Sequence, residues 1–382
     1  MSPATAALAV FLLLLAWPLA LYPALLVLLR QLRGGRPAPA PPEPEAWPDA
    51  VLIICALNEQ SVIGRKIENS LALDYPGRLR VVVVNDGSTD ATAEIARRYA
   101  ARGVEIVDRA QRRGKVANLN DVIGRRAEPV VVLSDANVFY HPAAVRRLVS
   151  RLLSDPRIGC VTGKVRLVNT TQWLREGEES YYSLEWLMQE EASRLWSMVG
   201  ADGAMYAFRR ELFRACPEDT IIEDLVLPVS IVRQGFRVVM EPGATAVEEG
   251  PQGEREEFRR KIRIASGAAQ GLKRGNAWPG GQAPPIFWFI WASHKLLRWM
   301  TPVTALLCLA AAALAWPHPL AQLVLAGAAA IALLAAIRKL TGWSTPLLNA
   351  PYYFLFGQIA VLIGLWRGAR GSQSVLWAKA NR

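Results

Sequence analysis

Arg80-Val-Val-Val-Val-Asn-Asp-Gly-Ser-Thr-Asp90 contains a short run of valines that leads directly into a polar turn. Two other segments have the same form. Val51-Leu-Ile-Ile-Cys-Ala-Leu57 precedes Asn58-Glu59, and Pro129-Val-Val-Val-Leu-Ser134 precedes Asp135-Ala-Asn137. Continuous apolar runs of this length, rich in β-branched residues, are typical of strands buried on both faces. The three runs therefore predict the central strands of an α/β domain.

Helices are predicted between and after these strands, at residues 59–73, 91–102, 116–126 and 142–153. Several of them begin with Asp, Asn or Pro, which favour the first positions of a helix. Alternating strands and helices indicate a mostly parallel sheet, whose ligand site lies beyond the carboxyl ends of its strands. We therefore expect the polar residues that follow the three strands to meet at one edge.

The composition points to a membrane protein. Of the 382 residues, 52% are hydrophobic and 20% are charged, and the net charge is +11. The hydrophobic fraction excludes a disordered chain, and the placement of the charge is more informative. Residues 258–382 carry 14 Lys and Arg and no acidic residue, spaced between long apolar runs. This pattern is typical of membrane segments, so we expect contact with membrane lipids and no nucleic-acid partner.

The chain divides into six predicted regions. They are an N-terminal transmembrane helix (1–30), a Pro-rich linker (31–49), a cytosolic domain (50–253), an amphipathic or interfacial region (254–299), a C-terminal transmembrane region (300–366) and a basic tail (367–382). The uncharged run 4–29 is long enough to cross the ~30 Å hydrocarbon layer, and it lacks the basic start and short apolar core of a cleaved signal peptide.

The positive-inside rule orients these regions. Arg30, Arg33 and Arg36 follow the first span, which predicts an outside N-terminus and a cytoplasmic domain in a multi-pass protein of the plasma (inner) membrane. The last apolar run, 346–366, is followed by Arg367 and Arg370, and a third C-terminal crossing would place these outside. Either this run is re-entrant or interfacial, or the tail is translocated despite its charge. We favour a cytosolic tail.

Six motifs, in this order and spacing, resemble the inverting family 2 glycosyltransferases of GT-A fold, in particular the membrane-embedded synthases of cellulose, hyaluronan, chitin and poly-N-acetylglucosamine. They are Ala56-Leu-Asn-Glu59, Asn85-Asp-Gly-Ser-Thr-Asp90, Arg113-Gly-Lys-Val-Ala-Asn-Leu-Asn120, Ser134-Asp-Ala-Asn137, Gly203-Ala-Met-Tyr-Ala-Phe-Arg209 and Ile222-Glu-Asp224. The resemblance implies an α/β GT-A nucleotide-diphospho-sugar transferase fold with a mostly parallel sheet, flanked here by transmembrane helices at both ends. The Gly-rich loops typical of ATP and dinucleotide sites are absent from the sequence.

The resemblance also implies roles for individual residues. The nucleotide sugar is expected to contact Ala56, Asn58, Glu59, Asp86, Lys115, Asp135, Arg260 and Arg263. Asp224 matches the family's catalytic base and Glu223 precedes it, while Asp202 and Gly203 are assigned to the acceptor side. Taken singly, each feature has a structural interpretation: residues 86–90 as a turn with a helix cap, Lys115 as a solvated lysine, and Asp224 as a carboxylate at a helix start.

Two departures from the family pattern stand out. Asp135 matches the first carboxylate of the family's metal-binding Asp-x-Asp, but the second is Asn137. Mg²⁺ or Mn²⁺ can still be held when phosphate oxygens and water complete the shell, so we expect a metal cofactor and tighter binding in Asn137→Asp. Processive members carry Gln-x-x-Arg-Trp where this chain has Arg260-Lys-Ile-Arg263-Ile264, in a segment that also fits a basic amphipathic helix on the membrane surface.

These features predict a membrane-bound, inverting hexosyltransferase that uses a UDP-sugar to extend a cell-surface or secreted polysaccharide. Two alternatives stay open. One is a non-processive enzyme that glycosylates a lipid or polyprenyl-phosphate-linked acceptor, favoured by the missing Trp. The other is a non-catalytic nucleotide-sugar-binding subunit of a secretion complex, favoured by Asn137. Four spans are few for a translocation channel, so a second copy of the chain or an export partner is also expected.

Overall fold

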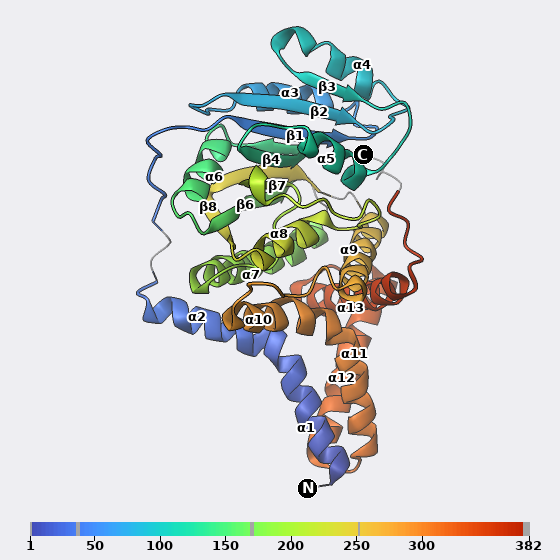
Figure 1. The fold of residues 1–382 in the computed structure, drawn as a ribbon. Helices are drawn as coiled ribbons and strands as arrows, with labels where there is room; N and C mark the ends of the chain where they lie inside the picture. The colour runs from blue at the N-terminus through green and yellow to red at the C-terminus, as the bar shows by residue number, and fades with distance from the viewer. Residues whose placement is uncertain (1, 36–38, 169–171, 251–252, 377–382) are drawn as a thin grey trace.

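A computed structural model describes residues 2–35, 39–168, 172–250 and 253–376 of the chain. Its centre is one eight-stranded sheet with the order β3-β2-β1-β4-β7-β6-β8-β5. The strands are β1 (Ala50–Ala56), β2 (Leu79–Asn85), β3 (Glu105–Asp108), β4 (Val130–Asp135), β5 (Val138–Tyr140), β6 (Ile158–Val168), β7 (Met205–Arg209) and β8 (Arg237–Glu249). The sheet forms the upper part of the molecule in Figure 1.

The three strands predicted from their apolar runs are confirmed as β1, β2 and β4, and they pair in parallel. The predicted helices are also present, each shorter than expected. They are α3 (Ile63–Leu71), α4 (Thr92–Arg97) with the 3₁₀ turn η2 (Ala100–Arg102), α5 (Lys115–Gly124) and α6 (Ala144–Leu153). The register pairs Ala56 with Asn85 and Cys55 with Asp135, so the polar segments after these strands meet at one edge.

The second half of the sheet is mixed. β7 is antiparallel to both β4 and β6, whereas β6 and β8 run parallel. The elements that accompany it are α7 (Gln172–Leu195), the 3₁₀ turn η3 (Arg210–Leu212), α8 (Glu223–Arg233) and α9 (Glu254–Arg274). One buried apolar cluster joins α5, α8 and a later helix, α10 (Pro285–Trp291), to the sheet, and the other joins α3 and α6 to it, so both faces are covered.

The N-terminal apolar segment is bent. It consists of α1 (Pro3–Ala16), the π-helix η1 (Trp17–Leu21) and α2 (Tyr22–Leu32), with Pro18 and Pro23 at the two junctions. Figure 1 shows that α1 points away from the sheet and that α2 turns aside beneath α7. Arg33, just after α2, pairs with Glu191 of α7 at 3.5 Å. This ion pair holds the end of α2 against α7.

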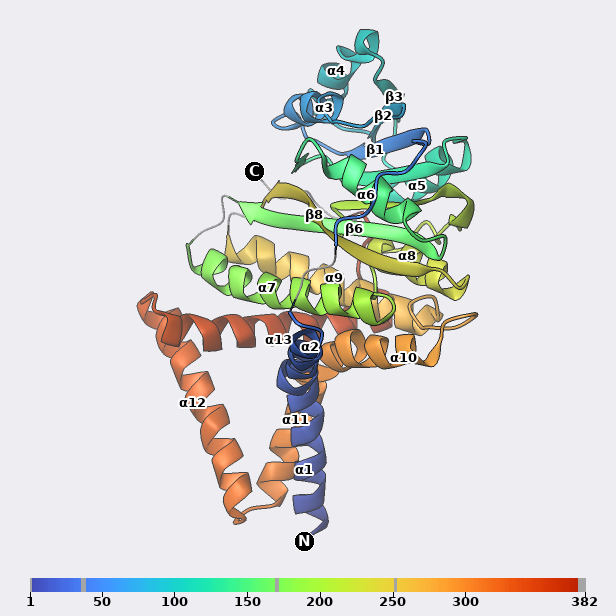
Figure 2. The ribbon, with the colours of Figure 1, turned by 90° about the vertical axis from the view of Figure 1, so that its left-hand side faces the viewer.

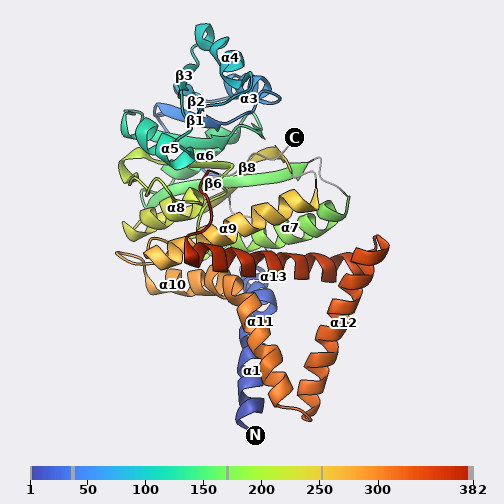
Figure 3. The same ribbon diagram turned by 90° about the vertical axis from the view of Figure 1, so that its right-hand side faces the viewer.

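The C-terminal apolar region contains α10 (Pro285–Trp291), the π-helix η4 (Ala292–Leu296), α11 (Leu297–Leu314), α12 (Pro319–Thr341) and α13 (Pro346–Arg370). Together with the N-terminal segment, the described residues include four helices long and apolar enough to cross a membrane. Figures 2 and 3 show that α1, α11 and α12 project away from the sheet, whereas α13 lies across them. The apolar helix that includes α11 starts at Pro285, earlier than the predicted run at residue 300.

α13 packs along α9 through two glycines one helical turn apart. A Cβ atom at Gly364 would lie 2.5 Å from that of Ala265, and one at Gly368 would overlap the carbonyl oxygen of Ser266. The two helices therefore approach as closely as small residues permit. Because α9 carries Arg263, this contact also links the C-terminal apolar helices to the site described below.

Gly368→Leu is expected to destabilise the protein by about 1–3 kcal/mol, because the added side chain must push α13 away from α9. The measurement is thermal unfolding of the purified protein in detergent, with sugar transfer assayed in parallel. Gly357→Leu is the matched control on the same helix, since no heavy atom lies within 4 Å of its added Cβ. Equal unfolding temperatures for the two variants would contradict this packing.

Candidate active site

The strand ends hold the turn at the start of α5. Asp86, only 6% exposed, follows β2, and its carboxylate accepts hydrogen bonds from the backbone N–H of Arg113 (2.7 Å) and Gly114 (3.0 Å). It also accepts from Asn118 Nδ2 at 2.7 Å. The backbone N–H of Asp86 donates to the carbonyl of Ala56 at 2.9 Å, which ties the ends of β1 and β2 together. The structure thus uses the Asp86 carboxylate to shape the turn that presents Lys115.

The loop after β1 is joined to the loop after β2. Asn58 adopts a left-handed conformation with φ 55°, and its Oδ1 accepts from the backbone N–H of Thr89 at 2.8 Å. The N–H of Asn58 donates to Ser88 Oγ at 2.9 Å, and that of Glu59 donates to Thr92 Oγ1 at 2.6 Å. The predicted nucleoside-side residues therefore lie on one connected surface at the edge of the sheet.

Lys115 joins two elements at the centre of the site. Its Nζ lies 2.8 Å from Oδ1 of Asp135 at the end of β4 and 2.6 Å from Oε1 of Glu223 at the start of α8. Burial disfavours the ammonium, but the two carboxylates outweigh it and raise the pKa of Lys115 well above its usual range. Lys115 is therefore a fixed positive charge at the helix start, where an anionic ligand is favoured.

The residues proposed to hold a metal are Asp135 and, in the turn between β4 and β5, Asn137. Among the described residues, no group of three or more His, Cys, Asp or Glu side chains is arranged to hold an ion. Mg²⁺ and Mn²⁺ prefer oxygen ligands and commonly combine one or two protein oxygens with phosphate oxygens and water. The donor set fits a cation that the protein holds together with the diphosphate of a nucleotide sugar.

Asp224 occupies the first turn of α8, after an extended residue, Ile222. Its carboxylate lies against Gly203, where an added Cβ would come within 2.7 Å of Asp224 Oδ2. Burial, reinforced by the charge of Glu223, raises the pKa of Asp224 to about 6. A carboxylate with this pKa is ionised at neutral pH and can still accept a proton, as a general base must.

Asp202 lies in the turn before β7, next to Gly203. Its backbone N–H donates to Thr162 Oγ1 at 3.0 Å, and its Oδ1 accepts from the N–H of Ala204 at 3.1 Å. Burial, with a further contribution from the carboxylate of Glu248, raises the pKa of Asp202 to about 7. The structure thus brings Asp202, Gly203 and Asp224 together, and the assignment of Asp202 and Gly203 to the acceptor stays a prediction.

The two arginines of α9 that are predicted to contact the diphosphate differ from each other in their surroundings. Arg263 reaches the loop before the base, where its Nη1 donates to the carbonyl of Ile221 at 3.4 Å, and its charge acts on Asp224. Arg260 pairs with the fully buried Glu257 one turn earlier, with Nε and Oε2 2.7 Å apart. Of the two arginines, Arg263 is thus the one the structure places beside the predicted base.

Two contacts near this site were not predicted. Gln270 of α9 accepts from the N–H of Ile221 at 3.1 Å and donates to the carbonyl of Asp219 at 2.9 Å, which holds the segment before Asp224. Helical spacing could have revealed it, since it lies seven residues after Arg263 on the same helix face. The second is the segment after α13, which reaches the turn before α5: the side chain of Leu376 lies 3.4 Å from the position of a Cβ on Gly114.

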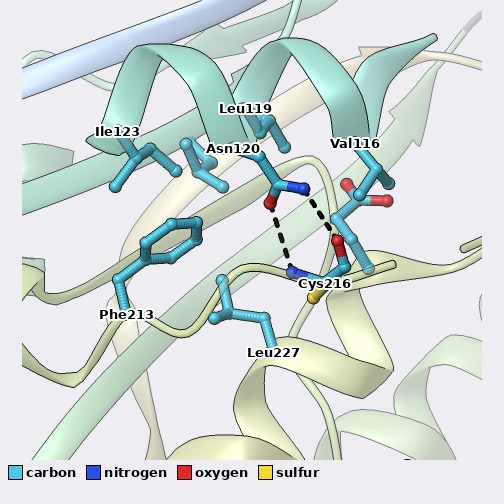
Figure 4. Close-up of a pocket in the computed structure, with 9 residues that line it drawn as sticks. Val116, Leu119, Asn120, Ile123, Phe213, Cys216 and Leu227 are labelled. Carbon is cyan, nitrogen blue, oxygen red and sulfur yellow. Dashed lines mark hydrogen bonds between the residues drawn. The ribbon is translucent and has the colours of Figure 1, made fainter. Parts of the chain in front are cut away.

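A small, largely apolar pocket lies behind α5 (Figure 4). Asn120 spans it, donating from Nδ2 to the carbonyl of Cys216 at 2.7 Å and accepting from the N–H of Cys216 at 3.2 Å. Phe213 and Leu227 face it from the other side. Asn120, the last residue of the motif that begins at Arg113, therefore fixes α5 to the chain that leads to α8.

Comparison with known proteins shows the family of the chain. Residues 48–267 match the family described as glycosyltransferase like family 2. Two similar curated proteins are the probable glycosyltransferase YdaM of Bacillus subtilis (strain 168) and the poly-beta-1,6-N-acetyl-D-glucosamine synthase of Staphylococcus aureus (strain COL). Each is 26% identical, over 231 and 227 residues respectively, and each alignment covers 58% of this chain. The chain spans 55% of the length of these curated relatives.

A solved structure matches nearly the whole chain. It is the mannosyltransferase PcManGT from Pyrobaculum calidifontis, in complex with GDP-Man and Mn²⁺. The match has a TM-score of 0.73 and 26% identity, and it covers 96% of this chain and 100% of that one. The fold is therefore GT-A-like, as the motifs predicted. Because the family match spans more than half of the chain, the protein belongs to the glycosyltransferase-like family 2.

Proposed function

We propose that the protein transfers a sugar, with inversion, from a nucleoside diphosphate sugar to a hydroxyl group of an acceptor at the membrane surface. The observation that carries the proposal is the placement of Asp224 beside Gly203, next to the connected group Lys115, Asp135 and Glu223. A base on one side and cationic groups for the leaving diphosphate on the other are what in-line displacement requires.

The proposed roles follow from this placement. Lys115 and Arg263 stabilise the negative charge that develops on the departing diphosphate, and Asp224 accepts the proton of the acceptor hydroxyl. Glu223 orients Lys115, which lies 2.6 Å away. Asp135 and Asn137 hold Mg²⁺ or Mn²⁺, which when bound neutralises diphosphate charge. Ala56, Asn58, Glu59 and Asp86 form the nucleoside side of the site.

The membrane arrangement is also a proposal. α1 with η1 (Pro3–Leu21) is 19 residues long, which at about 1.5 Å per residue approaches the ~30 Å hydrocarbon layer. We take α1, α11 and α12 as the crossing segments and α13 as interfacial, because α13 lies across them and packs along α9. This arrangement keeps Arg30, Arg367 and Arg370 on the side of the catalytic domain, as expected for the cytoplasm.

Two acceptors are candidates. A growing polysaccharide, built from a UDP-sugar, is supported by the similarity to the poly-beta-1,6-N-acetyl-D-glucosamine synthase. A lipid-linked acceptor that receives a single sugar is supported by Ile264 in place of the family's Trp. The contact between α1 and α11 also favours the lipid-linked acceptor. These helices pack directly on each other through Leu8, Ala311 and Ala312, so apolar side chains fill the space between them instead of a path for a polymer. A polymer made by this chain would need a second copy or an export partner to cross the membrane.

The test is transfer by the purified full-length protein with Mn²⁺ and membrane lipids, using radiolabelled UDP-sugars and GDP-sugars one at a time. The GDP-sugars are included because the similar mannosyltransferase is in complex with GDP-Man. Products are sized on gels and extracted with organic solvent. A polymer supports the first acceptor and a labelled lipid the second. Absence of transfer from every donor tested would contradict the proposed activity.

A further inference from the structure

Asn137 occupies the position where the resembled family has a second metal-binding carboxylate. It is 5% exposed, and it lies beside β8 because β5 and β8 pair with Val138 opposite Glu248. Its Nδ2 donates to Oε1 of Glu248 at 3.0 Å and to the backbone carbonyl of Glu249 at 3.4 Å. β8 thus provides a carboxylate and a carbonyl directly against the amide group of Asn137.

These two contacts determine which way the amide faces. Both partners are oxygen acceptors, so only the NH₂ end of the Asn137 amide can lie against them. The planar amide then directs Oδ1 away from β8, and among the described residues Oδ1 accepts no hydrogen bond. The carbonyl oxygen is therefore the atom left for a cation, two residues after the carboxylate of Asp135.

The charge of Glu248 completes the argument. Asn137 has no charge of its own, but the Glu248 carboxylate lies 3.0 Å from its Nδ2. A carboxylate that accepts from a ligand's N–H polarises that ligand and makes its donor oxygen more negative. Through this hydrogen bond, the Glu248 carboxylate lies one hydrogen bond further from the cation than the carboxylate of a ligating aspartate would lie.

We propose that Glu248 is a positioning residue that holds the Asn137 amide with its carbonyl oxygen presented to the bound cation and supplies the negative charge that an aspartate would carry. The proposal rests on the metal-dependent function above, and it revises the expectation for Asn137→Asp. With Glu248 present, an aspartate at residue 137 would bring two carboxylates to about 3 Å with no proton between them, which is unfavourable. Asn137→Asp alone is therefore expected to weaken metal binding.

The test is direct Mn²⁺ binding to the full chain in detergent, followed by the loss of the free-ion electron paramagnetic resonance signal, with and without UDP. Glu248→Gln is expected to weaken binding about tenfold, within the range known for residues that orient metal ligands. Asn137→Asp should also weaken it. The double variant Asn137→Asp with Glu248→Gln should recover to within about threefold of the wild type, because the glutamine amide can donate to the new carboxylate.

Glu249→Gln is the matched control, since it removes the neighbouring charge, whose partner is Arg65 at 3.0 Å. This variant is expected to bind Mn²⁺ like the wild type. Glu248→Gln with unchanged affinity, or Asn137→Asp that binds more tightly than the double variant, overturns the positioning role while leaving the metal site intact. A wild type that binds no Mn²⁺ in either condition overturns the metal site itself, and with it this part of the proposed function.

Discussion

Asp224→Asn is expected to lower kcat by about 10²–10⁴-fold while nucleotide affinity stays within about threefold of the wild type. The range is that of a lost general base, and the amide keeps the shape of the side chain but cannot accept the proton. Asp224 lies in the first turn of α8 beside Gly203, on the acceptor side of the proposed site. The loss should therefore appear in turnover and not in donor binding.

Steady-state transfer assays and calorimetric titration with UDP or GDP separate these two quantities. Asp155→Asn is the matched control, because this aspartate pairs with Arg157 in the turn after α6. Near-normal turnover in Asp224→Asn would remove Asp224 from the role of base, and a variant that has lost nucleotide affinity would place it on the donor side instead.

The pH dependence of the wild type follows from the same group. A base acts in its ionised form, so activity should rise with pH through about 6, the raised pKa of Asp224, and level off above 7. At pH 5 only about one tenth of Asp224 is ionised, and kcat should fall to about that fraction of its plateau. A rate that is flat between pH 5 and 7 would argue against Asp224 as the titrating base.

Gly203→Ala is expected to lower kcat by about 10²-fold, although it adds only one methyl group. The new Cβ would lie 2.7 Å from Asp224 Oδ2 and 3.2 Å from Asp224 Cβ, so the carboxylate must move. A displacement of about 1 Å in a reacting group can cost this much rate. Gly203, which was predicted on the acceptor side, is therefore expected to act by leaving room for the Asp224 carboxylate.

Transfer assays on Gly203→Ala and on Gly124→Ala test this account. Gly124 is the control because no heavy atom lies within 4 Å of its added Cβ. Both variants should unfold at temperatures near that of the wild type. Full activity in a folded Gly203→Ala variant would show that the Asp224 carboxylate does not need its present position.

Much of the fold could be predicted because β1, β2 and β4 are buried on both faces and therefore show continuous apolar runs. The strands β6 and β8 could not be found in this way. β8 (Arg237–Glu249) has a buried first half and a partly exposed second half, so its apolar pattern changes along its length. The antiparallel β7 also depends on pairing with β4 and β6, which are distant in sequence.

The candidate site could also be predicted only in part. Motif order placed Lys115, Asp135 and Asp224 near one another, and the structure brings Lys115 onto Asp135 and Asp224 beside Gly203. The partner of Asn137 could not be predicted, because Glu248 is more than 100 residues away and reaches it only through the pairing of β5 with β8. For α13 the sequence left two placements open, because its composition fits a span while the arginines that follow it favour a cytosolic tail; its contact with α9 is the structural observation that supports the interfacial placement.

The most direct test of the central claim is the anomeric configuration of the product, measured by proton nuclear magnetic resonance once an active donor and acceptor are known. In-line attack by an acceptor that Asp224 deprotonates inverts the anomeric carbon, so an α-linked donor should give a β-linked product. The predicted result is an inverted product from the wild type and a much lower yield of the same product from Asp224→Asn. A product that retains the configuration of the donor would contradict the account.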